Sequence, residues 1–312
     1  MESKMICRVL TGPTASGKSD LAMRLAMNNN WDIICMDSMQ VYRRMDIGTA
    51  KPSAEDRRKV RHYMLDICEP TDSFSVSAYI EQAEKKVREI ASEGREALFV
   101  GGTGLYLEGL VKPMGMGFVP ANEALRTELR QLAEQPEGRR LLDERLRKCD
   151  PETAEKLPLN DLRRRIRAIE VSEATGTPFS KQPESSAKSP FEWRIVCTAP
   201  ERETLYTRIN ERVQRMIDEG LAGEVSRLIA EGVPENAQSM QAIGYKEMIP
   251  FLHGEYPLGT AADLIRKGTR HYAKRQMTFM KRLEQVRFTD PFSDNAYGTI
   301  ENILKGNMTE NE

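Results

Sequence analysis

The stretch that most constrains the fold is an eight-residue pattern near the N-terminus. The letters GPTASGKS occupy positions 12–19 and match G-x-x-x-x-G-K-[ST] throughout. The apolar run 5–11 before it predicts a buried strand, and residues 19–28 after it have the apolar spacing of a helix. Between a strand and a helix this pattern forms a phosphate loop, because backbone amides and the positive end of the helix face the anion. The sequence therefore predicts a ligand that carries a di- or triphosphate.

Two side chains of this loop have distinct expected roles. Lys18 supplies a full positive charge to the phosphates, and the Ser19 hydroxyl can hold Mg²⁺. The other members offer backbone amides and close approach to the anion: Gly12, Pro13, Thr14, Ala15, Ser16 and Gly17. The pattern suggests a nucleotide such as ATP but does not select the ligand. A GTPase is disfavoured because no guanine-specific N-K-x-D sequence is present, whereas a small-molecule kinase fits the loop equally well.

Strand and helix patterns alternate along the first part of the chain. Further strand patterns cover residues 31–36 and 97–100, with an amphipathic helix pattern at 75–93 between them. A strand pattern returns at 193–199, followed by helix patterns at 202–219, 221–231 and 261–285. Strands that alternate with helices imply an α/β fold, in which crossover helices join the strands of a parallel sheet.

The character of the sequence changes after residue 112. A breaker-rich linker follows, with Pro113, Gly115, Gly117 and Pro120. Charged helix patterns then cover 123–134, 138–148, 151–156 and 161–173, with little strand signal. We therefore expect a P-loop NTPase-like parallel-sheet core formed by residues 1–112 and 191–312. A mainly helical insertion, 113–190, interrupts this core.

Composition limits the classes of protein that need consideration. The net charge of −1 excludes a polycation, so any nucleic-acid surface must come from local clusters. The cysteines are odd in number and scattered, which suits neither a disulfide framework nor a zinc site. The N-terminal residues lack the apolar run of a signal peptide, and no segment approaches the length of a membrane span. We expect a cytoplasmic, monomeric protein with no membrane association.

Polar residues follow the second strand pattern, at the sheet edge where ligands bind in open α/β folds. Asp37 there could take a proton from an attacking group or help to hold Mg²⁺. The alternative is that Asp37 merely caps a helical turn. Further along, Thr49 and Lys51 could contact phosphate, although a surface turn would explain them as well.

Five motifs together carry a resemblance to a known family. They are GPTASGKS, DSMQVYRRMDIGTAKP, GGTGLYLEGL, NDLRRRIRAIEV and QAIGYKE, in this order. The chain resembles the tRNA isopentenyltransferase family from about residue 6 to residue 288. The resemblance implies a P-loop core with a helical insertion. It also implies Mg²⁺-supported transfer of a dimethylallyl group from dimethylallyl diphosphate to an adenine of tRNA. That adenine lies 3′ of the anticodon in tRNAs that read codons beginning with U, and the atom modified is N6.

The resemblance also implies catalytic roles. Lys18, Ser19 with Mg²⁺ and the loop amides would stabilise the departing pyrophosphate, and Asp37 would be the general base. Thr103 of GGTG would lie near the adenine and Asp37, although it is also placed to cap a helix. Arg208 and Arg212 resemble arginines near the diphosphate. We favour Arg212, and a solvated helix face is the alternative for both.

RNA contacts are implied at several segments. Besides Asp37, they are Ser38, Met39, Gln40, Arg126, Arg163, Arg164, Arg165, Ile166, Arg167, Gln241, Ala242, Ile243, Gly244, Tyr245 and Lys246. Residues on one helix cannot all point one way, so about half of the arginines at 163–167 should reach phosphates. Leu162 and Arg163 stand where relatives often carry Pro and Gln. The basic stretch 266–287 predicts a further phosphate-tracking surface, and the target base would have to flip out of its stack.

Two other activities remain open from the residues. A P-loop small-molecule kinase would use ATP, but it would not need the arginine-bearing insertion or QAIGYKE. An adenylate isopentenyltransferase would act on free adenine nucleotides instead of tRNA, and only the acceptor distinguishes the two.

Overall fold

The computed structural model describes residues 4–112, 119, 121–182 and 189–307. The chain divides into two compact units, Met1–Val111 with Pro190–Glu312 and Lys112–Ser189. We call them the core and the insertion. These boundaries lie within one residue of those expected from the sequence. The breaker residues Pro113, Gly115, Gly117 and Pro120 fall outside the described residues.

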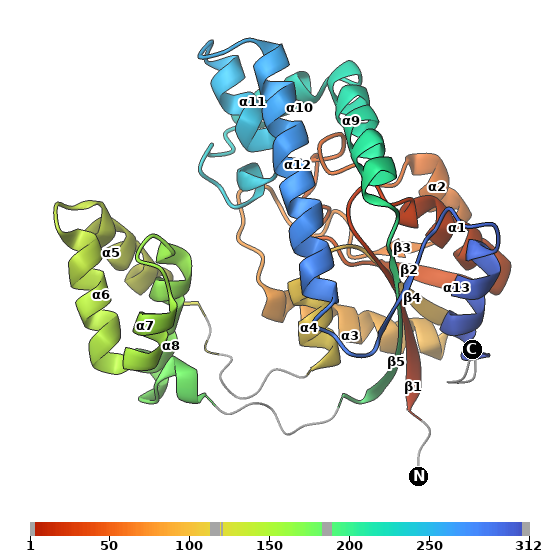
Figure 1. Ribbon diagram of the computed structural model, residues 1–312, viewed down its shortest axis with the longest axis horizontal. Helices are drawn as coiled ribbons and strands as arrows, with labels where there is room; N and C mark the ends of the chain where they lie inside the picture. The colour runs from red at the N-terminus through yellow and green to blue at the C-terminus, as the bar shows by residue number, and fades with distance from the viewer. Residues whose placement is uncertain (1–3, 113–118, 120, 183–188, 308–312) are drawn as a thin grey trace. The chain divides into compact units, whose positions relative to one another are not determined.

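The core contains one six-stranded sheet (Figure 1), and its strands are parallel, as the sequence predicts. Its strands are β1 (Met5–Thr11), β2 (Trp31–Cys35), β3 (His62–Tyr63), β4 (Glu96–Val100), β5 (Phe191–Thr198) and β6 (Val286–Thr289), in the order β3-β2-β4-β1-β5-β6. The two edge strands β3 and β6 were not expected from the sequence. They are too short to give a period-2 pattern, and they are defined by pairing with β2 and β5.

The helices of the core surround this sheet. They are α1 (Lys18–Asn29), α2 (Ala54–Lys59), α3 (Val76–Ser92), α4 (Gly104–Val111), α9 (Arg202–Asp218), α10 (Leu221–Ala230), α11 (Tyr245–Leu252), α12 (Leu258–Met280) and α13 (Ala296–Lys305). The helices predicted around 19–28, 75–93, 202–219 and 221–231 are confirmed. The helix predicted at 261–285 ends at Met280, because the chain then turns so that Val286 pairs with Ile195 of β5.

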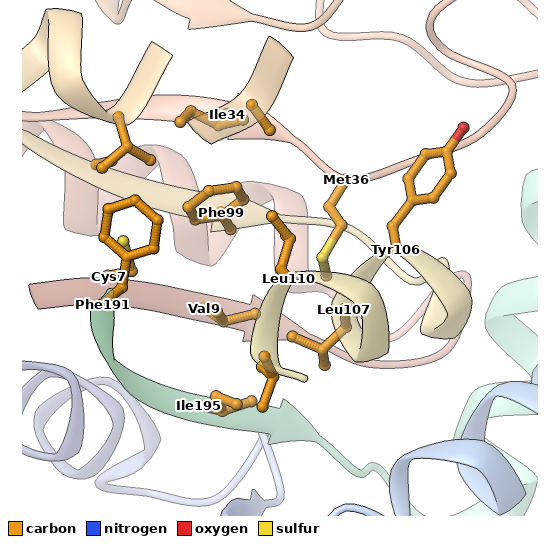
Figure 2. Packing of buried hydrophobic residues seen from close by; sticks show 14 of the residues in the cluster. Cys7, Val9, Ile34, Met36, Phe99, Tyr106, Leu107, Leu110, Phe191 and Ile195 are labelled. Atoms are coloured by element: carbon orange, nitrogen blue, oxygen red, sulfur yellow. The ribbon is translucent and has the colours of Figure 1, made fainter. Parts of the chain in front are cut away.

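Alternate residues of the central strand β1 supply two cores. Val9 joins Phe99 and Ile195 in the core under α3 and α4, which Figure 2 shows from close by. Leu10 instead joins Leu25 of α1 and residues of α13 on the other face. Because both faces of a parallel sheet are covered, its central strand is mostly apolar, and its buried Arg8 is paired with Glu96 at 3.0 Å. This explains why the sequence signal for β1 is strong.

The remaining core helices form a layer of their own. Helices α9 to α12 gather at the end of the sheet toward which the strands point (Figure 1). They share an apolar core with the segment that follows β2, through Val41, Tyr42 and Met45 on that segment and Leu221 on α10. The loops at the carboxyl ends of the strands are therefore enclosed by helices far along the chain.

The insertion has its own small core. Its elements are α5 (Glu123–Glu134), α6 (Gly138–Cys149), α7 (Pro151–Lys156), α8 (Leu162–Thr175) and the 3-10 turn Phe179–Lys181. Leu129, Leu142, Leu146 and Ile169 pack together at its centre. The helical character expected for this segment is confirmed among its described residues. In the described chain as a whole, no helix combines the length and apolarity that a membrane crossing requires.

Candidate active site

The phosphate loop joins β1 to α1 and is seated on the end of β5. Gly12 has a φ of +145°, and a Cβ there would lie 2.1 Å from Thr198 Oγ1. The hydroxyls of Ser16 and Thr198 lie 2.6 Å apart. Gly17 adopts the left-handed conformation at the start of α1. Glycine is thus needed at both positions, at Gly12 for space and at Gly17 for its backbone angles.

This loop opens on a cavity of about 850 Å³ in the core. Its lining comes from the phosphate loop, the segment after β2, α9, the QAIGYKE segment and α12. Predicted site residues in the lining include 14–19, 37–40, Arg208, Arg212, 241–243 and Lys246. The fold therefore brings together most of the core residues that the sequence singled out.

Lys18 is the central cation of the cavity. Its Nζ donates to the carbonyl oxygen of Pro13 at 3.1 Å. Burial and the nearby charge of Arg212 lower the pKa of Lys18 to about 8, while Asp37 opposes this shift. Lys18, Arg212 and Asp37 are therefore electrostatic neighbours. Because two cations surround one carboxylate, a net positive charge remains that can attract an anionic ligand.

The two arginines of α9 lie one turn apart and both reach the cavity. Arg208 Nε donates to Ala15 O of the phosphate loop at 2.9 Å, and its guanidinium stacks on Phe292 at 4.8 Å. Arg212 Nη2 donates to Thr49 O at 3.4 Å. Burial lowers the pKa of Arg212, whereas Asp37 raises it. The alternative of a solvated helix face is therefore wrong, because Arg208 bonds to the phosphate loop and Arg212 to the loop that contains Thr49.

Asp37 and Thr103 approach one another because their strands are neighbours. Both follow paired strands, β2 and β4. Thr103 Oγ1 accepts from the Ser38 backbone amide at 3.0 Å. Asp37 Oδ1 accepts from the Met39 amide at 2.9 Å, so the turn-capping interpretation holds together with a place in the cavity. Thr103 lies beside the cavity lining and supports the segment that carries Asp37.

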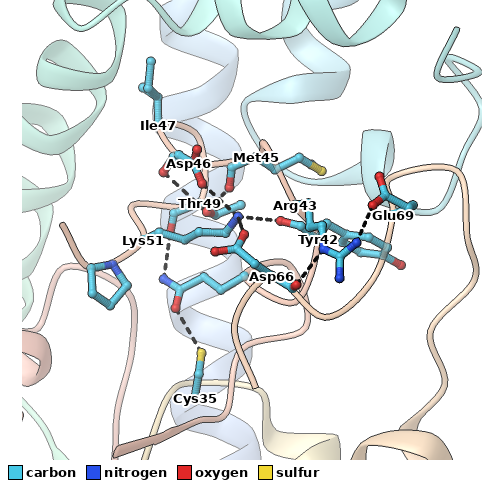
Figure 3. A network of polar contacts seen from close by, with 12 residues as sticks. Cys35, Tyr42, Arg43, Met45, Asp46, Ile47, Thr49, Lys51, Asp66 and Glu69 are labelled. Carbon is cyan, nitrogen blue, oxygen red and sulfur yellow. Dashed lines mark hydrogen bonds and ion pairs between the residues drawn. The ribbon is translucent and has the colours of Figure 1, made fainter. Parts of the chain in front are cut away.

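The segment after Asp37 is fixed by a polar network, which Figure 3 shows. The Lys51 side chain is 1% exposed and pairs with Asp46 at 2.8 Å and Asp66 at 2.6 Å. Thr49 is buried, and its hydroxyl donates to Met45 O at 2.6 Å. The structure corrects both expectations for Thr49 and Lys51. These residues do not form a surface turn, and their side chains are not free to bind phosphate, because they stabilise the loop.

A buried carboxylate anchors the same loop from α10. Glu224 is 2% exposed and accepts from the backbone amides of Asp46 and Ile47, each at 2.9 Å, and of Gly48 at 3.2 Å. The Tyr245 hydroxyl also donates to Glu224, at 2.6 Å. We did not single out Glu224 from the sequence, since an acidic residue on a helix gives no local signal of such a role.

The expected RNA contact of Tyr245 is corrected by this arrangement. Its side chain is fully buried, with the ring against Gly48, where a Cβ would lie 2.3 Å from Tyr245 Cε2. Tyr245 is therefore a packing residue that ties α11 to the loop. Its neighbours Gln241 and Lys246 are exposed in the cavity lining. Gly244 has a φ of +104°, which lets the chain turn between them.

The insertion arginines are not equivalent. Arg163 and Arg164 are exposed on α8. Arg165 is 1% exposed, pairs with Asp143 and donates to Pro158 O and Ala154 O. The expected RNA contact for Arg165 is therefore wrong, because its guanidinium is buried and bonded to other residues of the insertion. The same correction applies to its neighbour at position 166, Ile166, which is buried in the insertion core.

Arg126 and Arg167 share one buried carboxylate. Both donate to Glu170, whose side chain is fully buried, at 2.9 Å and 2.5 Å. Burial by itself raises the pKa of Glu170, and the hydrogen bonds from these arginines more than offset that rise. Their charges therefore stabilise the insertion first. Of the insertion arginines predicted to bind RNA, only Arg163 and Arg164 are exposed, and Arg164 lies 3.6 Å from Asp161.

The basic stretch on and after α12 is mostly exposed. Arg266 pairs with Asp263, and Arg270 bonds to Asn210. The other cations of this stretch lie exposed: Lys267, Lys274, Arg275, Lys281, Arg282 and Arg287. Arg275 also lines the cavity. A surface rich in positive charge therefore adjoins the cavity, as the sequence predicts.

Ser19 is the residue to consider for Mg²⁺. It is exposed in the first turn of α1 and lines the cavity. Among the described residues there is no group of three or more His, Cys, Asp or Glu placed to hold a metal. Mg²⁺ takes most of its ligands from water and substrate phosphates and needs few from protein. A single hydroxyl beside a phosphate loop fits that requirement.

Comparison with known proteins identifies the family of the chain. A family model described as IPP transferase matches residues 40–283. The chain belongs to this family. The tRNA dimethylallyltransferase of Acetivibrio thermocellus is 40% identical, over 95% of this chain and 94% of that protein. The tRNA dimethylallyltransferase of Thermotoga neapolitana is 42% identical, over 89% and 90% respectively. The resemblance drawn from the five motifs is confirmed.

Solved structures of the family share the architecture. The tRNA isopentenylpyrophosphate transferase of Bacillus halodurans has a TM-score of 0.72 and 38% identity, with coverage of 97% of this chain and 96% of that one. The corresponding Staphylococcus epidermidis enzyme has a TM-score of 0.70 and 34% identity, with coverage of 97% and 98%. A eukaryotic dimethylallyltransferase acting on tRNA, at 24% identity, covers 99% of this chain and 81% of its own length with a TM-score of 0.81, which supports the fold.

Proposed function

We propose that this protein transfers the dimethylallyl group of dimethylallyl diphosphate to N6 of the adenine 3′ of the anticodon, in tRNAs that read UNN codons. The products are N6-dimethylallyladenosine and diphosphate. The observation that carries the proposal is the single cavity that unites a phosphate loop, two flanking cations and the carboxylate of Asp37. The names of the relatives support tRNA as acceptor.

The reaction exchanges one bond to carbon for another. The adenine N6 supplies the electron pair for a new N–C bond to C1 of the donor. The bond between C1 and the diphosphate oxygen breaks, and its electron pair leaves on the diphosphate. The proton that N6 loses goes to the Asp37 carboxylate. Adenine N6 is a poor nucleophile because its lone pair is delocalised into the ring, so alignment and proton removal are what it needs.

Negative charge grows on the diphosphate as the C–O bond breaks. Lys18, Arg212 and the loop amides are fixed before the reaction, so they stabilise this charge without reorganisation. Arg208, which bonds the loop at Ala15, would hold the loop against the diphosphate. Mg²⁺ held by Ser19 would supply further charge neutralisation at the diphosphate.

Asp37 is held where a base would be needed. Its Oδ1 takes the Met39 amide, and the adjacent Ser38 amide is bonded to Thr103. These contacts fix the carboxylate at the end of β2 without an ion pair to a side chain of the loop network. These contacts support Asp37 as the base and Thr103 as the residue that keeps its segment in place.

RNA binding rests on cations outside the cavity. Arg163 and Arg164 of the insertion and the exposed cations of α12 would contact phosphates of the anticodon stem-loop. Gln241 and Lys246 of the lining would contact the loop nucleotides. The acceptor base must enter the cavity to reach Asp37, so it would flip out of its stack.

Three acceptor assays separate this function from its alternatives. The protein is incubated with labelled dimethylallyl diphosphate and an anticodon stem-loop, with the same donor and AMP, and with ATP in place of the donor. Label on the stem-loop alone is expected. Label on AMP in preference would make the protein an adenylate isopentenyltransferase, and phosphoryl transfer from ATP without prenyl transfer would make it a kinase.

A variant of the base completes the assay. Asp37→Asn keeps the acceptor for the Met39 amide but cannot take the proton, so prenyl transfer should fall roughly 100-fold or more. Affinity for the stem-loop should change little. An equal loss of RNA affinity would instead make Asp37 a binding residue.

A further inference from the structure

Helix α12 closes over two loops that the proposed reaction uses separately. A Cβ on Gly104 would lie 2.4 Å from the Phe279 ring, so the helix packs directly on the GGTG loop. The Thr11 hydroxyl at the end of β1 donates to Met280 Sδ at 3.7 Å. The second half of α12 thus contacts both the strand that leads to the phosphate loop and the loop after β4.

One side chain of this helix bridges the two loops. Gln276 is 5% exposed. Its Oε1 accepts from the Thr14 amide of the phosphate loop at 2.9 Å. Its Nε2 donates to Gly102 O of the GGTG loop at 2.9 Å. A carboxamide has an oxygen that accepts and a nitrogen that donates. An ionised Glu could not donate to Gly102 O, and Met could make neither of the two hydrogen bonds.

The backbone at the bridge leaves no room for another arrangement. A Cβ on Gly102 would lie 2.1 Å from Gln276 Nε2 and 2.9 Å from Gly12 O. The two loops therefore touch beneath the bridge. Gly102 is needed because the carboxamide and the neighbouring loop occupy the space of a side chain.

A second residue of α12 extends the contact toward Asp37. Tyr272 lies four residues before Gln276, so both share a helix face. Burial and the charge of Asp37 raise the pKa of Tyr272, and hydrogen bonding to Thr103 and Gln276 opposes that rise. Tyr272 therefore lies near Asp37, Thr103 and Gln276, and it lines the cavity.

The two loops have different duties in the reaction. The phosphate loop would hold the donor diphosphate, while the loop with Thr103 supports Asp37 and the acceptor base. They follow separate strands, β1 and β4, which pair side by side but do not fix the distance between the loop tips. Alignment of N6, C1 and the leaving oxygen depends on that distance, and a misplacement of about 1 Å costs on the order of 100-fold in rate.

We propose that Gln276 is a positioning residue that sets the donor loop against the acceptor loop through its bonds to Thr14 and Gly102. The inference rests on the proposed function. It assigns to a residue that touches neither reacting atom the task of holding the two half-sites in register.

Two variants test the bridge. Gln276→Glu keeps the acceptor for the Thr14 amide but sets a carboxylate oxygen against Gly102 O. Gln276→Met keeps the length and loses both bonds. Each variant should lower kcat for transfer to the stem-loop about ten-fold or more, the cost of a buried hydrogen bond lost in the reactive arrangement. The KM for the stem-loop should stay within about three-fold in both variants, and in Gln276→Met, which adds no charge beside the phosphate loop, so should the affinity for inorganic pyrophosphate.

Thr278→Ala, an exposed change on the same helix, is the control and should leave kcat as in the unaltered protein. Should Gln276→Met fail to fold by circular dichroism, Gln276→Glu decides. A normal kcat in Gln276→Glu would overturn the inference, and so would an equal loss of kcat and of pyrophosphate affinity in Gln276→Met, which would confine Gln276 to the donor loop. Absence of transfer by the unaltered protein would instead overturn the proposed function.

Discussion

At the scale of the residue, the site is governed by a few charges held close together. Lys18 and Arg212 are cations whose pKa values burial lowers, and Asp37 opposes that shift in both. Bringing cations together costs free energy, which an anionic ligand recovers when it binds. This arrangement explains why the cavity should favour a diphosphate over a neutral ligand.

The lowered pKa of Lys18 predicts a pH dependence. With a pKa of about 8, Lys18 is protonated below that pH and loses its charge above it. Affinity for inorganic pyrophosphate should therefore fall as the pH rises through about 8. Isothermal titration calorimetry across this range measures it.

The matched variant for this prediction is Lys18→Arg. A guanidinium stays charged throughout the range, so the fall should disappear. Deprotonation of pyrophosphate itself increases its charge and works in the opposite direction. The same decline in Lys18→Arg would show that another group is responsible.

At the scale of the element, loops are shaped by helices that come much later in the chain. The segment after β2 depends on Glu224 of α10 and Tyr245 of α11. That segment in turn offers the Thr49 carbonyl to Arg212. Side chains of the C-terminal helices therefore fix the backbone of a loop that borders the cavity.

Removal of one hydroxyl tests this anchor. Tyr245→Phe deletes the donor to a buried carboxylate and should lower the free energy of unfolding by about 1.5–3 kcal/mol. Urea denaturation measures the change. Tyr256→Phe is the control, because its hydroxyl donates to the backbone carbonyl of Glu247 in a less buried place, and it should cost clearly less. Equal costs would mean that the Glu224 carboxylate adds nothing to the bond.

At the scale of the whole molecule, the proposed function divides between two units. The core holds the cavity, and the insertion contributes exposed arginines on α8. The other insertion arginines predicted to bind RNA are used internally, since Arg165 pairs with Asp143, and Arg126 and Arg167 pair with Glu170. A charge run in sequence is therefore a poor count of phosphate contacts, because pairing removes several members.

The exposed pair predicts a salt effect. Arg163→Ala with Arg164→Ala should weaken binding of the stem-loop and reduce the slope of log affinity against log salt by roughly 1–2. Filter binding over a range of salt concentrations gives the slope. Arg139→Ala with Arg140→Ala, an exposed pair on α6 of the same unit, is the control and should leave the slope nearly unchanged. Equal slopes in the two double variants would place the RNA surface elsewhere.

Local patterns were sufficient for much of this protein. The strand, the glycine loop and the helix around Lys18 are consecutive, so their apolar spacing and conformational demands are visible in a short window of sequence. The same holds for α5 and α7, whose predicted ends agree with the structure. The family resemblance rested on motifs of this kind and needed no knowledge of contacts.

What the sequence by itself determined was the phosphate loop, the family and most of the elements, although it did not predict β3, β6, α2 or α13. Only the tertiary structure decided which polar side chains face the cavity and which form hydrogen bonds and ion pairs inside the protein. Gln276 bonds to an amide 262 residues earlier, and Glu224 to amides more than 170 residues earlier. Such roles have no local pattern, because they arise when the packing of late helices on early loops decides which partner each buried polar group must find.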